Sequence, residues 1–133
     1  MPHAATPEAV ATVRYQVANI ERSIAFYTER LAFRLGTKSG TAFADVLCGH
    51  LRLILSGPGA SGSRPMPDGR QQGPGGWNRI ILTVEDLAKQ IGELERAGVT
   101  FRNRTEEGPG GKQILIEDPD GNPIELHEAP KNG

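Results

Sequence analysis

The strongest constraint on the fold is an internal repeat, because the chain runs through the same order of elements twice. Apolar residues take alternate positions over residues 12–17 and again over residues 79–84, which predicts a strand with one buried face in each half. Asn19 follows the first strand and Asp86 follows the second, and both residue types are favoured helix caps. A repeat of this kind limits the choice of fold more than any single motif does.

Each cap leads into a helix and then into short strands. Apolar residues at helical spacing reach Leu31 in the first half and Ala97 in the second, where Gly98 suits the end of a helix. Short strands are expected after each helix, at residues 33–38, 42–48 and 51–55, and then at 100–105, 112–117 and 124–128. The sequence therefore predicts an α+β fold built from two tandem βαβββ modules.

The expected organisation is a single domain over residues 1–133, with module 1 at 11–56 and module 2 at 77–129. Residues 57–76 contain seven glycines and four prolines, which predicts a flexible linker or a flap. The linker ends in Gly-Pro-Gly-Gly, and the same four residues recur at 108–111. Both copies lead into a strand, whereas a phosphate-binding loop leads into a helix, so both are interpreted as turns.

Composition excludes several classes of protein. The net charge of −1 gives no indication of a nucleic-acid or anionic membrane partner. The longest apolar runs are too short to span a bilayer, and the N-terminus lacks the basic and apolar regions of a signal peptide. Cys48 is the single cysteine and lies in an apolar run, which favours a half-buried structural thiol. A cytoplasmic location is expected.

Residues 117–128 combine a tight acidic turn with a final strand. Pro119, Asp120 and Gly121 supply turn chemistry, and the strand that follows alternates between apolar and polar positions. Glu125 and His127 share the polar face, so they are candidates for acid–base catalysis or for a metal site. A solvated outer face would give the same local pattern.

Several segments resemble the vicinal oxygen chelate superfamily, which includes glyoxalase I, bleomycin and fosfomycin resistance proteins and extradiol dioxygenases. The resemblance rests on the two modules, on residues 17–27 and 31–33, and on the ending Asp-Pro-Asp-Gly-Asn-Pro-Ile-Glu-Leu at 118–126. It implies a glyoxalase/bleomycin resistance/dioxygenase-like fold, in which each pair of modules forms a cup-shaped mixed sheet. It also implies a homodimer and, in many members, a divalent metal held by the first and last strands of each module.

Most of the family's metal ligands have no match in this chain. The two positions that are usually histidine hold Thr12 and Arg79, and the fourth-strand position of module 1 falls near Leu53. Only Glu125 matches, and one carboxylate beside a guanidinium does not hold a divalent ion against water. The resemblance instead implies an Arg79–Glu125 ion pair, because the first and fourth strands of such a module lie side by side. No cofactor is expected; zinc, nickel, manganese or iron bound through Glu125 is the alternative.

The remaining polar positions would line the cup. Strand parity points Thr12, Arg14, Gln16, Trp77, Arg79, Ile81, Thr83, Glu125 and His127 toward it. The candidate ligand-binding residues are Arg14, Gln16, Trp77, Arg79 and Thr83, and two guanidinium groups favour an anionic or strongly polar ligand. Trp77, the only tryptophan, is either a stacking wall for a planar ligand or a core or interface aromatic.

Two classes of function remain open. The first is a metal-free protein, resembling the bleomycin resistance branch, that binds a small polar or anionic molecule between the modules. The second is a lyase, isomerase or dioxygenase that uses Glu125 and His127, or a rebuilt metal site. The expected partners are the small molecule and a second copy of the chain.

Overall fold

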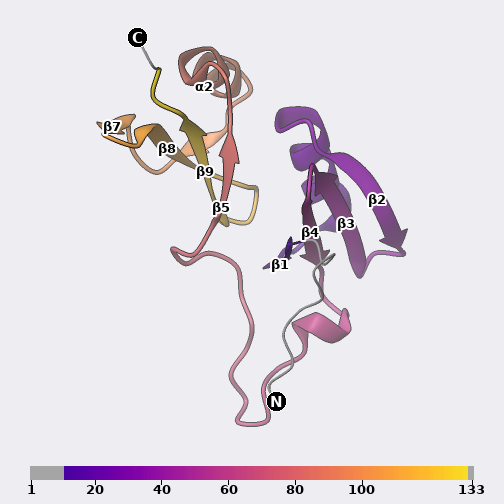
Figure 1. Cartoon of the computed structure of the whole chain (residues 1–133). Coiled ribbons are helices and arrows are strands. Elements are labelled where there is room, and N and C mark those ends of the chain that lie inside the picture. The colour runs from indigo at the N-terminus through magenta and orange to yellow at the C-terminus, as the bar shows by residue number, and fades with distance from the viewer. Residues whose placement is uncertain (1–10, 132–133) are drawn as a thin grey trace, which may run out of the picture.

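The computed structural model describes residues 11–131, and the expectation about the N-terminal residues lies outside that range. Figure 1 shows two lobes, one from each half of the sequence, joined by a long connecting segment, residues 57–79. The first lobe contains β1 (Ala11–Gln16), α1 (Ile20–Ala25), the π-helical turn η1 (Phe26–Arg30), β2 (Arg34–Ser39), β3 (Phe43–Cys48) and β4 (Leu51–Ser56). The second contains β5 (Ile80–Thr83), α2 (Leu87–Arg96), β6 (Thr100–Phe101), β7 (Glu106–Gly108), β8 (Gly111–Glu117) and β9 (Pro123–Glu128).

The strand order is equivalent in the two sheets. The first sheet runs β1-β4-β3-β2 and the second runs β5-β9-β8-β6, with β7 paired to β8. In each sheet the first strand lies parallel to the last one, β1 beside β4 and β5 beside β9. The predicted α+β fold of two βαβββ modules is therefore confirmed.

The predicted helix caps are also confirmed. The Asn19 side chain accepts a hydrogen bond from the backbone N–H of Arg22, and the Asp86 side chain accepts one from Lys89. Gly98 follows α2 with a φ of 78°, and its N–H donates to the carbonyl of Glu95. The next N–H, of Val99, donates to Leu94, which completes the reciprocal hydrogen bonds that often end a helix.

One predicted strand is wrong in length. Residues 100–105 form only the two-residue strand β6, and a short hairpin of β7 and β8 follows. The reason lies at Asn103, whose side-chain oxygen accepts a hydrogen bond from the backbone N–H of Leu115. A longer β6 would use the Leu115 N–H for backbone pairing. Because the Asn103 side chain accepts the hydrogen bond from that N–H, the pairing of β6 with β8 ends there.

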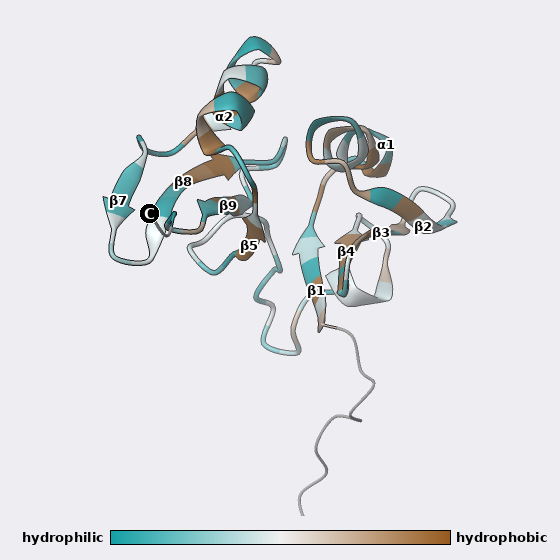
Figure 2. Cartoon of the chain, turned by 45° about the horizontal axis from the view of Figure 1, so that its top comes forward, coloured by the Kyte–Doolittle hydropathy of each residue, from teal (hydrophilic) through white to brown (hydrophobic). Residues whose placement is uncertain are grey.

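Both helices lie on the same side of the sheet layer, which leaves the opposite face of each sheet open (Figure 2). Fully buried side chains lie between each helix and its sheet, and these include Tyr27, Leu53, Leu94 and Leu126. Strand alternation then places the polar positions of β1 and β5 on the open face. No described helix has both the length and the apolar character that a membrane crossing requires.

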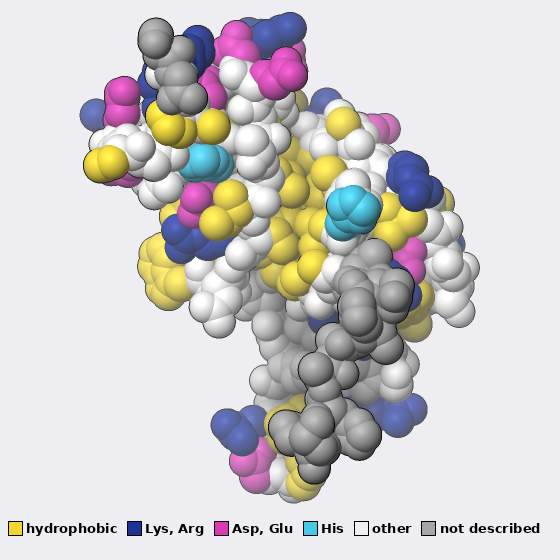
Figure 3. Space-filling model, viewed as in Figure 1, with side chains coloured by type: hydrophobic (Ala, Val, Ile, Leu, Met, Phe, Trp, Pro, Cys, Tyr) yellow, Lys and Arg dark blue, Asp and Glu magenta, His cyan; other side chains and the backbone are white. Residues whose placement is uncertain are grey.

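The turn at residues 118–122 joins the two lobes. Asp120 Oδ1 accepts hydrogen bonds from the Ala18 N–H and from Arg22 Nη2, and Asp118 Oδ2 accepts one from the Tyr27 hydroxyl, all in the first lobe. The Tyr15 hydroxyl of the first lobe also donates a hydrogen bond to the carbonyl of Pro123 in the second lobe, 2.7 Å away. We call this set of contacts the seam. Hydrophobic side chains gather along the junction of the two lobes in Figure 3.

Candidate functional site

A cavity of about 380 Å³ lies where β1 meets the start of β5. It draws residues from β1, from the end of the connecting segment, from the entry to β5 and from the seam turn. The lining residues are Val13, Arg14, Tyr15, Gln16, Gly73, Gly75, Asn78, Arg79, Ile80 and Asn122. Three of the five predicted ligand-binding residues, Arg14, Gln16 and Arg79, therefore share one cavity.

Arg79 forms the predicted ion pair with Glu125. Its Nη2 and Nε donate to the same carboxylate oxygen, Oε1, at 2.8 and 3.1 Å. The Glu125 side chain is 7% exposed and that of Arg79 is 29% exposed, so the anion is buried and the cation reaches the edge of the cavity. Arg79 Nη1 also donates to the carbonyl of Trp77, which fixes the guanidinium at the entry to β5.

The residues at the family's metal positions do not fit a divalent cation. Glu125 is already occupied by Arg79, and Thr12 supplies only a hydroxyl. Strand register shows that Ile54, not Leu53, is the counterpart of Glu125, because Arg14 pairs with Ile54 as Ile81 pairs with Glu125. The fourth-strand position near Leu53 is therefore that of Ile54; Leu53 itself faces the core, and both residues are apolar. Within residues 11–131 no three histidine, cysteine or carboxylate side chains converge as a metal site.

Arg14 is the second guanidinium of the cavity and has no carboxylate partner among the described ion pairs. Its Nη1 donates to the Ser56 hydroxyl at 2.8 Å, across the β1–β4 pair. Glu125 balances the positive charge of Arg79, whereas no carboxylate in the described ion pairs balances that of Arg14. An anion entering the cavity would meet Arg14 as its principal cation.

Amide groups supply further polar contacts. Gln16 Nε2 donates to the carbonyl of Gly62 and to Gln72 Oε1 in the connecting segment. The Asn122 side chain accepts from the Gly75 N–H and donates to the carbonyl of Gln16, so it links the connecting segment to β1. The cavity wall is therefore held by hydrogen bonds from three separate parts of the chain.

Trp77 lies outside the cavity and outside the core. Its side chain is 70% exposed, so the interpretation as a core aromatic is wrong. The guanidinium carbon of Arg102 lies 4.8 Å from the ring centroid, in cation–π geometry. Arg102 is fixed in turn by Glu117 and by the carbonyls of Gly76 and Gly121. The indole is thus held in place with most of its surface free.

The structure does not bring Thr83, Glu125 or His127 to the lining of the cavity. Thr83 and His127 pair with each other further along β5 and β9. His127 Nε2 lies 2.7 Å from the carbonyl of Gly110, beside a smaller hollow of about 210 Å³. Glu125 and His127 share the open face, as parity predicts, but each has a different protein partner.

Several lining residues have no signal in the sequence. Strand alternation places Tyr15 on the buried face, yet its hydroxyl reaches the backbone of β5 and accepts from the Ile80 N–H. Asn78 and Asn122 belong to no periodic pattern, so the sequence alone does not mark them as lining residues. Asn122 is 3% exposed, and its side chain bonds to β1 and to the connecting segment.

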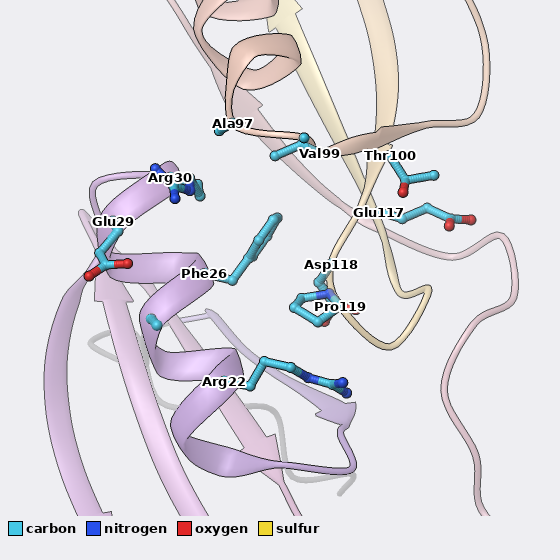
Figure 4. Close-up of a pocket in the computed structure, with 12 residues that line it drawn as sticks. Arg22, Phe26, Glu29, Arg30, Ala97, Val99, Thr100, Glu117, Asp118 and Pro119 are labelled. Carbon is cyan, nitrogen blue, oxygen red and sulfur yellow. The ribbon is translucent and has the colours of Figure 1, made fainter.

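A second hollow, of about 330 Å³, lies on the helix side of the junction (Figure 4). The Phe26 ring points across it toward Val99, with Arg22 and Arg30 to either side. Its charges are largely satisfied, since Arg22 pairs with Asp120 and Asp118 accepts from Tyr27 and from the backbone and side chain of Asn122. We therefore regard the open-face cavity as the candidate site.

Burial governs the titration of the seam. Desolvation raises the pKa of Asp118 above 3.8, although hydrogen bonds from Asn122, Tyr27 and Asp120 work in the opposite direction. Desolvation and the negative charge of Asp118 raise the pKa of Tyr27 well above 10.0. Desolvation also raises the pKa of Tyr15, against the hydrogen bond from Ile80. Through their hydrogen bonds, Tyr15, Tyr27 and Asp118 link the two lobes.

Comparison with known proteins defines the family. The model of the Glyoxalase/Bleomycin resistance protein/Dioxygenase superfamily matches residues 9–126. The chain belongs to this superfamily. No match was found among the curated proteins.

Solved structures of the superfamily share the fold. One is TnmS3, an antibiotic binding protein from Streptomyces sp. CB03234, with a TM-score of 0.73 and 25% identity over 96% of this chain and 100% of that one. A superfamily member from Sphaerobacter thermophilus gives 0.72 and 27% identity over 90% and 95%. A lactoylglutathione lyase from Agrobacterium tumefaciens gives 0.71 and 22% identity over 93% and 96%, which supports the fold alone.

Proposed function

We propose that the protein binds a small anionic or strongly polar molecule, without a metal, in the cavity between its modules. The observation that carries this proposal is the Arg79–Glu125 ion pair, which puts a guanidinium where metal-using relatives would need a ligand. Arg14, which pairs with no carboxylate among residues 11–131, lines the same cavity together with the amide side chains of Gln16, Asn78 and Asn122. A concave, partly apolar site with a few fixed polar groups is typical of small-molecule binding.

A solved relative supports the proposed binding role. TnmS3, at 25% identity, is described as an antibiotic binding protein. A role in sequestering a small organic molecule is therefore reasonable for a member whose metal positions hold threonine, isoleucine and arginine. We also propose a cytoplasmic location, with which a single cysteine, Cys48, is consistent.

The proposal also includes a homodimer. On the open face, Ile81 is 58% exposed, and Trp77 at the entry to the same strand is 70% exposed. Large apolar side chains left uncovered on one face often mark a surface that a partner covers. The seam already closes one junction within the chain, so the second copy would cover the open faces rather than replace that junction.

Two measurements test the proposed function. Calorimetry with a panel of aromatic carboxylates and their neutral amides should give binding to the acids, with Arg14→Gln abolishing the preference. Elemental analysis of protein purified without chelator should give far less than one equivalent of zinc, nickel, manganese or iron. If a metal is present and Glu125→Gln removes it, the metal-free proposal is wrong and the lyase, isomerase or dioxygenase alternative gains support.

A further inference from the structure

The connecting segment touches the candidate site at one glycine. The short turn η2 (Ser61–Ser63) lies against β1, and the carbonyl of Gly62 accepts a hydrogen bond from Gln16 at 3.0 Å. The same residue lies over the guanidinium of Arg14. A methyl group built on Gly62 would overlap Arg14 Nη1 and Cζ and would come within 2.8 Å of Nε.

Position 62 needs a glycine because there is no room for a side chain there, and not because of the backbone conformation. Its φ lies outside the left-handed region, unlike that of Gly59 or Gly69, so another residue could adopt its backbone without strain. The atoms that a methyl group would meet form the far end of one flexible side chain. An alanine at this position would therefore displace the Arg14 guanidinium and leave the fold intact.

Arg14 is held on two sides before any ligand arrives. Gly62 covers the guanidinium from the connecting segment, and Ser56 Oγ accepts from Nη1 on the β4 side. Gln16 holds Gly62 in turn, and Gln72 bonds both to Gln16 and to the carbonyl of Arg64. A cation fixed in this way loses less side-chain entropy when it binds an anion, which increases affinity.

We infer that Gly62 is a specificity-determining residue of the cavity, which acts by positioning Arg14 to bind a carboxylate or a similar planar anion. The inference rests on the proposed function and adds the η2 turn to the binding site. In this arrangement the η2 turn is a wall beside Arg14, and the discrimination between an anion and its neutral analogue depends on a residue that need not touch the ligand.

The test compares Gly62→Ala with Gly108→Ala. Gly108 also has an ordinary φ, no atom lies within 4 Å of a methyl group built on it, and it lies far from the cavity lining. The probes are 1-naphthoate and its neutral counterpart 1-naphthamide, titrated calorimetrically into each variant. Loss of a well-placed charged hydrogen bond should weaken naphthoate binding to Gly62→Ala by about ten- to a hundredfold. Naphthamide binding and the melting temperature should change little.

A double-mutant cycle shows whether the effect passes through Arg14. Once Arg14→Gln is present, adding Gly62→Ala should produce no further loss of naphthoate affinity. Equal naphthoate binding by wild type and Gly62→Ala would overturn the inference and leave the proposed function standing. Equal weakening of naphthoate and naphthamide would also overturn it, because Gly62 would then only shape the cavity. If wild type binds neither probe, the anion-binding proposal fails and the inference fails with it.

Discussion

Removal of the Arg79 guanidinium should destabilise the protein by leaving a buried carboxylate without its partner. The variant Arg79→Met keeps an unbranched chain of similar length and deletes the charge. Glu125 accepts from both Nε and Nη2 of Arg79, and its side chain is 7% exposed. The substitution therefore strands an anion that water cannot readily hydrate.

The magnitude follows from the burial of the two partners. Breaking a fully buried ion pair by deleting one partner costs about 3–5 kcal/mol. Because the Arg79 side chain is 29% exposed, we expect about 2–3 kcal/mol here. An unfolding entropy of about 2.1 cal/mol/K per residue, over 133 residues, converts this into a fall in melting temperature of about 7–11 °C.

The chain supplies its own control. Arg70 pairs with Asp68 at 2.8 Å, the same distance as the Arg79–Glu125 pair, but the two side chains are 79% and 56% exposed. Arg70→Met should change stability by less than about 0.5 kcal/mol. Urea and thermal unfolding followed by circular dichroism would measure both variants, and the combination Arg79→Met with Glu125→Leu should recover most of the loss.

Two results would refute this reasoning. If Arg79→Met melts within about 2 °C of Arg70→Met, the pair is solvated and does not act as a buried counter-charge. If the loss of stability in the double variant equals or exceeds the sum of the losses in the two single variants, Glu125 does not depend on Arg79 as its partner.

The remaining predictions concern the connecting segment, the seam, metal affinity and assembly. Limited proteolysis should cut first near Arg64 or Arg70, where trypsin cuts after Arg70 because Pro65 follows Arg64, and more slowly with ligand bound; first cleavage within 12–56 would contradict the linker assignment. The pKa of Tyr27 is raised in the folded protein, so its contribution to stability is present below pH 10.0 and is lost as the pH rises through the folded-state pKa. Tyr27→Phe should reduce the fall in the free energy of unfolding at alkaline pH, measured by urea titrations. An unchanged dependence of that free energy on pH would contradict the role given to Tyr27. Arg79→His, which puts an imidazole beside Glu125, should raise zinc affinity about tenfold by calorimetry, with Arg79→Lys as the control. Light scattering at micromolar concentration should give the mass of a dimer, and a monomer mass would contradict the proposed assembly.

Local and periodic signals predicted most of the fold. Alternation over 12–17 and 79–84, the caps Asn19 and Asp86, and the terminator Gly98 each depend on a few neighbouring residues. The Arg79–Glu125 contact was also predictable, because parallel pairing of the first and last strands fixes it once the topology is known. Such features need no knowledge of distant packing.

Features set by contacts between distant residues were not predictable in the same way. The choice between Leu53 and Ile54 depends on a one-residue register in an apolar run that carries no polar marker. The early end of β6 depends on which donor the Asn103 side chain takes. The positions of Gly62 and Asn122 against β1 depend on the path of the connecting segment through space. The amino-acid composition of that segment does not determine this path.

The seam has a consequence for how the chain acquires its structure during synthesis. Its hydrogen bonds connect residues that are 91 to 108 positions apart, from Tyr27–Asp118 to Tyr15–Pro123. Each module can form its own strand pairs over much shorter separations, and contacts of high sequence separation form late because of their loop-closure entropy. The first module therefore emerges from the ribosome with Tyr15, Arg22 and Tyr27 lacking their partners until residues 118–123 have been made. Chains that stop before that turn should expose this surface and be especially prone to aggregate.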